Sequence, residues 1–132
     1  MKRNNAYFLL PIVFFFLLEV QALKAQEYPK RELRAAWIAT VENIDWPDEK
    51  GLKAQDQKEQ YVLLLDKLKA AGMNAIIMQI RPTADTFYPS SYEPWSAYLT
   101  GEQAQAPQAY YNPLTFLIDE AKKKRHGISC VV

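Results

Sequence analysis

The stretch that decides the fold runs from Asn74 to Ile80 and reads NAIIMQI. It is apolar at nearly every position, and Gly72 lies two residues before it. A short, continuously apolar run is typical of a strand that is buried on both faces of a parallel sheet. A second run of this kind, RAAWIATV, extends from Arg34 to Val41. The sequence therefore predicts two buried strands, at 34–41 and 74–80.

The segment between these strands predicts a helix over residues 56–71. Its apolar side chains recur at the spacing of one helix face, and charged side chains occupy the other faces. Gly72 is well suited to end this helix, because glycine readily adopts the left-handed conformation that follows a helix. The residues of the predicted buried face are Tyr61, Leu64, Leu65 and Leu68.

A second helix is predicted to begin at Asn112 and Pro113, which suit the N-cap and the first helical position. Residues 128–132 are predicted to start a third strand. The element order is thus β-α-β-α-(β), an α/β fold whose helices are long enough for right-handed crossovers between parallel strands. The predicted buried stripe of the second helix is Leu114, Leu117, Ile118 and Ala121.

The first residues of the chain have the three parts of a secretory signal. Two basic residues precede an apolar run over residues 7–18, and the small residues Ala22 and Ala25 follow it. The alternative is a retained membrane anchor, but the run is about a dozen residues long, whereas a bilayer span needs roughly 20. We therefore expect a signal peptide at 1–25, cleaved after Ala22 or Ala25, and a domain at 26–132 without a stable membrane span. The expected location is secreted or periplasmic, in the cell envelope.

Charge and cysteine content exclude several classes of function. Removal of residues 1–25 would take three basic side chains and one acidic side chain from totals of 16 and 15, which leaves 13 and 14. A near-neutral domain lacks the basic surface that nucleic acid requires. Cys130 is the single cysteine, and neither it nor His126 has a partner at metal-ligand spacing. The sequence also has no glycine-rich phosphate loop, so we expect no metal and no cofactor.

Candidate functional side chains follow both predicted strands. In parallel α/β folds, ligands bind at the carboxyl ends of the strands. The loop after the second strand has about 30 residues, whereas about 2–6 are usual, and long loops are often functional. The candidates after the first strand are Glu42, Asn43, Asp45 and Trp46, and those after the second are Arg81, Thr83, Asp85, Tyr88, Tyr92, Trp95 and Tyr98.

Aromatic side chains interleaved with Asp, Asn and Arg are what a sugar-binding cleft requires. Sugar rings present apolar faces that stack on aromatic rings, and hydroxyl rims that need polar partners. Alternatively, the aromatics only pack the loop down, and Arg81 is an ion-pair partner of Asp85. Glycoside hydrolysis normally uses two carboxylates about 5–10 Å apart. No pair is evident, so the catalytic residues are unknown; Asp45 and Asp85 are weak candidates by position only, as are Glu42 and Glu93.

Three stretches resemble the opening of a known family, the glycosyl-hydrolase-like 10 family. They are KRELRAAWIATVENIDWP (30–47), AGMNAIIMQIRPTADTFYPSSYEPWSAYLTGEQ (71–103) and YYNPLTFLIDEA (110–121). The resemblance implies the first part of a TIM-type (β/α)8 barrel, in a family of secreted and envelope proteins of which some are implicated in cleaving peptidoglycan glycan strands. It therefore implies a carbohydrate partner, a polysaccharide or oligosaccharide. The residues that it would place in the sugar cleft are Arg81, Asp85, Tyr88, Trp95 and Ser96, with Asn43, Asp45 and Trp46 beside them.

The end of the chain departs from the family pattern. Family members continue with a sequence like KRGMEFHAWLNPYR, whereas this chain reads KKKRHGISCVV. Codons permitted for residues 125–132, read one base later, encode GMEFHAW, so residues from about 124 to 132 are expected to be out of frame. A closed barrel needs roughly 250 residues, and we expect the chain to be an inactive N-terminal fragment of a glycoside hydrolase. The alternatives are a non-catalytic carbohydrate-binding module and a pseudogene fragment without function.

Overall fold

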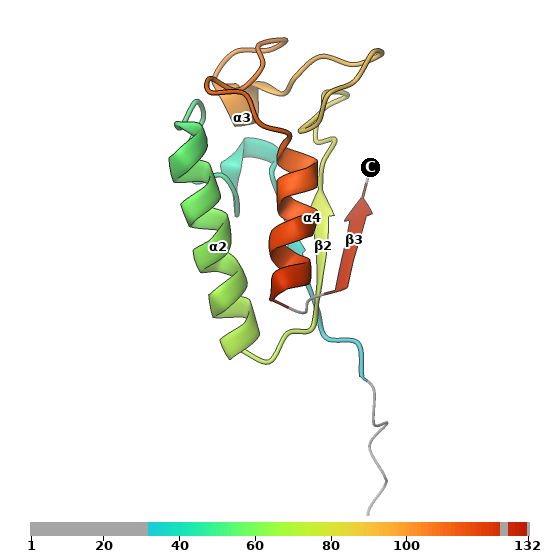
Figure 1. The fold of residues 1–132 in the computed structure, drawn as a ribbon. Coiled ribbons are helices and arrows are strands. Elements are labelled where there is room, and N and C mark those ends of the chain that lie inside the picture. The colour runs from blue at the N-terminus through green and yellow to red at the C-terminus, as the bar shows by residue number, and fades with distance from the viewer. Residues whose placement is uncertain (1–31, 125–126, 132) are drawn as a thin grey trace, which may run out of the picture. The chain divides into compact units, whose positions relative to one another are not determined.

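The computed structural model describes residues 32–124 and 127–131 (Figure 1). The predicted signal segment at 1–25 lies outside these residues. Within them, strands and helices alternate as the hydrophobic pattern predicts. The elements are β1 (Ala35–Ile38), the 3-10 helix η1 (Val41–Asn43), α2 (Ala54–Ala70), β2 (Ala75–Gln79), α3 (Ala97–Thr100), α4 (Pro113–Lys123) and β3 (Gly127–Val131).

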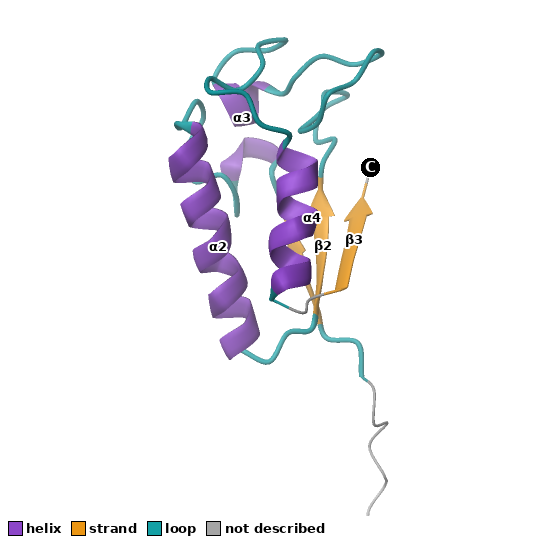
Figure 2. Ribbon diagram, in the orientation of Figure 1, coloured by secondary structure: helices purple, strands orange, loops and turns teal. Residues whose placement is uncertain are grey.

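The three strands form a parallel sheet in the order β1-β2-β3 (Figure 2). Ala36 of β1 lies opposite Ile76 of β2, and Ile76 lies opposite Ile128 of β3. The predicted third strand is therefore confirmed as a strand, and it pairs in parallel with β2. The interpretation that residues from about 124 to 132 are out of frame stays a prediction.

Helices α2 and α4 lie on one face of the sheet, and the core lies between them and the strands (Figures 1 and 2). Alternate residues of β2 point into this core, so Ile76 and Met78 are 0% and 1% exposed. They join Leu65 of α2 and Leu117 of α4 in one buried cluster. The predicted face residues of both helices join this cluster, with the exception of Ile118, whereas Phe116, outside the predicted stripe, packs against it.

The other face of the sheet is only partly covered by the described residues. Trp37 of β1 is paired in register with Ile77 of β2 on this face, and Trp37 is 51% exposed. The prediction that both strands are buried on both faces is therefore wrong for β1 within the part of the chain that the structure describes. The apolar pattern of β1 marks a surface that the described helices do not reach.

Strand β1 is also shorter than predicted, ending at Ile38 rather than Val41. The reason is that the backbone N–H groups of the next three residues donate to side chains and not to a neighbouring strand. The backbone N–H of Ala39 donates to the carboxylate of Asp45, at 2.8 Å. The N–H groups of Thr40 and Val41 both donate to the side chain of Gln79. These three donors therefore leave the sheet and begin a turn.

The predicted helix starts and stops are close to those observed. Helix α2 begins two residues earlier than predicted, at Ala54, and Gly72 follows its end with φ of +80°. Helix α4 begins at Pro113, and the Asn112 side chain accepts a hydrogen bond from the N–H of Thr115, at 3.2 Å. None of the helices in the described ranges is long and apolar enough to cross a membrane.

The long connection between β2 and α4 is folded onto the rest of the domain. It contains the short helix α3 and a single parallel bridge between Thr86 and Trp95. Phe87 and Leu99 anchor it, since both side chains are 0% exposed within the core cluster. The loop therefore has a fixed course over the carboxyl ends of the strands (Figure 1).

Two leucines on α2 test this core directly. Leu65 is fully buried, whereas Leu63 on the same helix is 59% exposed. Leu65→Ala is expected to lower the free energy of unfolding by about 2–5 kcal/mol, because it leaves a cavity beneath the sheet. Leu63→Ala is the matched control, expected to change it by no more than about 0.5 kcal/mol. Urea denaturation followed by circular dichroism measures both, and equal losses would contradict the packing.

Candidate functional site

The candidate site lies where β1 and β2 end, because parallel strands present their carboxyl ends at the same edge of a sheet. Two loops meet there. One is the turn over residues 39–45 after β1, and the other is the long loop from Ile80 to Asn112. We call this region the strand-end face.

The turn after β1 is closed at its base by two hydrogen bonds between Ala39 and Asp45. The Ala39 N–H donates to the Asp45 carboxylate at 2.8 Å, and the Asp45 N–H donates to the Ala39 carbonyl at 3.0 Å. At its tip, Glu42 and Asn43 have φ of +53° and +56°. Such left-handed backbone is costly for residues with a Cβ. The surrounding contacts must therefore hold this turn in place.

Gln79, the last residue of β2, holds the turn from one side. Its Oε1 accepts from the N–H groups of Thr40 and Val41, at 3.0 and 3.1 Å. Its main-chain carbonyl accepts from the Thr40 hydroxyl at 2.9 Å. The sequence interpretation missed Gln79, although a polar residue at the end of an otherwise apolar strand is a signal that could have revealed it.

Asn43 holds the turn from the other side. Its Nδ2 donates to the carbonyl groups of Pro47 and Tyr98, each at 2.8 Å. This links the first loop to the short helix α3 in the long loop. Its Oδ1 is buried and has no hydrogen-bond partner in the described part of the chain. Asn43, predicted as a sugar contact, therefore joins the two loops that form the strand-end face.

Arg81 lies just beyond the end of β2 and forms an ion pair with Glu93. Its Nε donates to Glu93 Oε2 at 2.6 Å, and its Nη2 contacts Glu93 Oε1. The alternative that Arg81 pairs with Asp85 is therefore wrong. Asp85 instead accepts from the hydroxyl of Thr83, at 3.0 Å, and from its N–H. The Arg81 and Glu93 side chains are 31% and 20% exposed, so both retain accessible surface.

The predicted site residues divide by exposure. Asp45 is exposed, and Arg81, Tyr88 and Trp95 are partly exposed. Three others are enclosed. Trp46, Asp85 and Ser96 are 1%, 2% and 0% exposed.

The enclosed residues have structural partners that account for their burial. Trp46 packs edge-on against Tyr61, with ring centroids 5.7 Å apart, and its Nε1 donates to the Gln57 carbonyl at 3.0 Å. The Ser96 hydroxyl caps α3 by accepting from the Tyr98 N–H, at 3.3 Å. The structure therefore gives Trp46 and Ser96 roles beneath the strand-end face, where they have no surface to offer a sugar.

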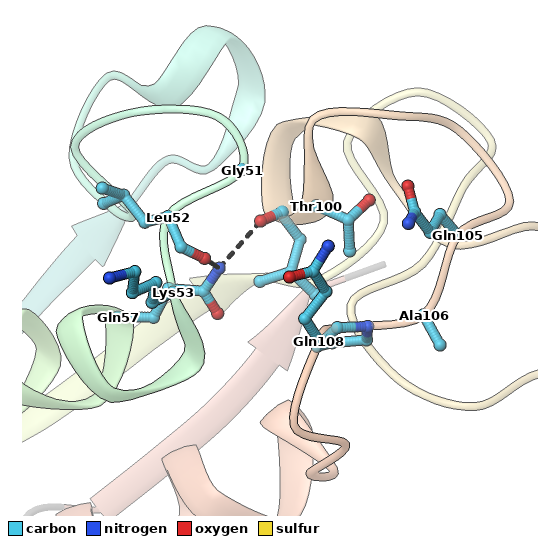
Figure 3. A pocket seen from close by; sticks show the side chains of 10 residues that line it. Gly51, Leu52, Lys53, Gln57, Thr100, Gln105, Ala106 and Gln108 are labelled. Atoms are coloured by element: carbon cyan, nitrogen blue, oxygen red, sulfur yellow. Dashed lines mark hydrogen bonds between the residues drawn. The ribbon is translucent and has the colours of Figure 1, made fainter.

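A polar hollow of about 70 Å³ lies where the segments 51–53 and 99–108 meet (Figure 3). Gln57 forms its floor, and its Nε2 donates to the carbonyls of Leu52 and Leu99, at 2.9 and 2.8 Å. Ligand pockets usually measure about 300–1,000 Å³. This hollow therefore has room for water rather than for a sugar ring, and the described residues form no cluster suited to a metal ion.

Comparison with known proteins assigns the chain to a family. The family model described as "Glycosyl hydrolase-like 10" matches residues 32–129. The chain belongs to the glycosyl hydrolase-like 10 family. It is also similar to a protein named glycosyl hydrolase YngK of Bacillus subtilis (strain 168), with 52% identity over 113 residues. The match covers 86% of this chain and 22% of that relative. The chain thus spans about a fifth of the length of the relative that it matches.

In this member of the glycosyl hydrolase-like 10 family, Tyr111 supports the strand-end face from below. Its hydroxyl donates to Gln57 Oε1 at 2.6 Å. Burial raises the pKa of Tyr111 above its ordinary value of 10.0, because the tyrosinate is disfavoured away from water. The stabilisation given by neutral Tyr111 is therefore complete below about pH 10 and is lost as the pH rises towards the raised value.

Tyr111→Phe tests this contact. At neutral pH it is expected to cost about 1 kcal/mol of unfolding free energy, because Gln57 Oε1 loses its partner. The difference between wild type and variant should shrink between about pH 9 and pH 11. Urea denaturation at both pH values measures it, and an unchanged or growing difference would contradict the buried, neutral phenol.

Proposed function

We propose that this protein is an exported member of the glycosyl hydrolase-like 10 family that binds polysaccharide or oligosaccharide chains of the peptidoglycan type. The observation that carries the proposal is the strand-end face, where a cation, carboxylates, amides and aromatic rings share one edge of a parallel sheet. This combination suits sugars, whose rings have both apolar faces and hydroxyl rims. The names of the family and of the relative, which both refer to glycosyl hydrolases, add support.

The residues that we propose to touch the sugar are those with accessible surface. Tyr88 and Trp95 are half-buried and pack against the core on one side, which leaves the other side of each available for stacking. Arg81 has donors directed at Glu93 and is still 31% exposed. Asn43, Trp46, Asp85 and Ser96 support this surface from beneath.

We further propose that these strands and helices are the first units of a TIM-type barrel, and that hydrolysis requires units outside this chain. A closed barrel takes roughly 250 residues, and the relative is several times longer than the matched region. Hydrolysis also normally needs two carboxylates, one on each side of the scissile bond. Of the two weak catalytic candidates, Asp85 is buried and Asp45 closes the turn after β1, so we assign the catalytic pair to the further units.

Co-sedimentation tests the proposed binding. The purified 132-residue chain is expected to pellet with peptide-free peptidoglycan glycan strands, and to release no new reducing ends from them. Cellulose is the comparison polysaccharide, and chitin separates recognition of N-acetylglucosamine from recognition of the bacterial polymer. A chain that binds none of the three would overturn the proposal. Measurable release of reducing ends would overturn the part that assigns hydrolysis to further units.

Export is tested by the fate of residues 1–25. A fusion of this segment to a reporter that is active only outside the cytoplasm is expected to give signal. Replacement of several leucines in residues 7–18 by charged residues is expected to abolish that signal, because the translocation machinery requires an apolar segment. N-terminal sequencing of the exported protein should begin at Leu23 or Gln26. An exported protein that keeps residues 1–25 would indicate an anchor instead.

A further inference from the structure

The side-chain amide of Gln79 has hydrogen-bond partners at its oxygen and none at its nitrogen among the described residues. Its Oε1 accepts two backbone hydrogen bonds, from Thr40 and Val41. Its Nε2 carries two N–H donors, and neither has a partner in residues 32–124 or 127–131. The amide orientation is fixed, because only the oxygen can accept from those two N–H groups. The structure therefore holds a pair of N–H donors in one direction at the end of β2.

These donors lie on the side of the sheet that the helices do not cover. Met78 and Ile80 point into the core, at 1% and 5% exposure, whereas Gln79 alternates with them and is half-buried. A half-buried donor group without a protein partner requires water or a ligand. The position therefore suits a hydrogen bond to a molecule at the strand-end face.

Glu42 lies next to the backbone that Gln79 binds, since it follows Val41 directly. Glu42 is exposed, and its carboxylate has no partner within the described ranges. Its backbone is held in the left-handed region with φ of +53°, by the contacts of Gln79 on one side and Asn43 on the other. An exposed carboxylate without a hydrogen-bond or ion-pair partner among the described residues, on backbone in the left-handed region, is available to bind a ligand.

We propose that Gln79 Nε2 and the Glu42 carboxylate form a donor–acceptor pair that binds adjacent hydroxyl groups of a sugar ring. This inference rests on the proposed glycan binding and names a subsite for it. Each sugar hydroxyl can donate one hydrogen bond and accept others. One hydroxyl accepts from Gln79, and its neighbour donates to Glu42.

The charges around this subsite favour a neutral polyol over other ligands. Glu42 carries a negative charge, which disfavours phosphate. The cation that follows β2, Arg81, is already paired with Glu93. Gln79 Oε1 is occupied by two N–H donors, so it has little capacity left to bind a metal ion. Sugar hydroxyl groups can accept from the N–H groups of Gln79 and donate to the Glu42 carboxylate, and they carry no net charge.

Gln79→Glu is the sharpest test, because the change replaces one NH2 group by oxygen. The remaining oxygen still accepts from Thr40 and Val41, so the melting temperature is expected to stay within about 2 °C of wild type. Affinity for peptide-free peptidoglycan glycan strands is expected to fall about tenfold or more, because a donor becomes an acceptor. Isothermal calorimetry on the 132-residue chain, with soluble glycan oligomers, measures the change.

Gln60→Glu is the matched control. Gln60 is also half-buried, and its Oε1 also accepts from a backbone N–H, that of Asp48 at 3.2 Å. It lies on α2, which covers the face of the sheet opposite to the one that Gln79 points from, so the same change in charge is expected to leave glycan affinity unaltered. An equal loss in both variants would show a general effect of charge and would overturn the subsite.

Glu42→Gln tests the hydrogen-bond acceptor of the proposed pair. It also replaces Gln79→Glu as the test if Gln79→Glu lowers the melting temperature. Glu49→Gln, at another exposed glutamate in the connection between β1 and α2, is its control. Glu42→Gln is expected to weaken binding about fivefold or more with no change in stability. If wild type binds and Glu42→Gln binds equally well, the subsite is overturned while the proposed function stands. If wild type does not bind, both fall.

Discussion

The packing of β2 against α2 and α4 is the constraint on which the rest of the structure depends. Ile76 and Met78 are buried in one cluster with Leu65 of α2 and Leu117 of α4. Once that face is fixed, the period of two along a strand places Gln79 on the opposite side. The same constraint fixes where β2 ends, and hence where Arg81 and the long loop begin. The chemistry of the strand-end face is thus a consequence of how one strand is buried.

The periodic parts of this fold could be predicted from sequence, because burial imposes a pattern on every strand and helix that it involves. The run 74–80 and the Asn112–Pro113 pair gave β2 and the start of α4 nearly to the residue. The turn at Glu42 and Asn43 could not be predicted. Its left-handed backbone depends on contacts with Gln79 and Tyr98, which are distant in sequence. The turn also contains no glycine that would have predicted this conformation.

The region of the candidate site could be predicted from the sequence, but the contacts of its residues could not. The carboxyl ends of the strands follow from topology alone, so the two loops that meet there can be named from the sequence. Individual roles depend on which partner a side chain finds. Thr83 satisfies Asp85 locally, and the Thr86–Trp95 bridge folds the loop back so that Glu93 reaches Arg81. Trp46 is a residue type that suits both a sugar cleft and a core, and only the packing distinguishes them.

The pairing of Arg81 with Glu93 has a consequence for how ligands arrive. A cation that is neutralised at close range projects little field into solution, so it does not attract ligands from a distance. Encounter then depends on diffusion and shape, and the association rate should vary little with ionic strength. The glycan binding that we propose would then proceed at a rate that depends little on the salt content of the surroundings.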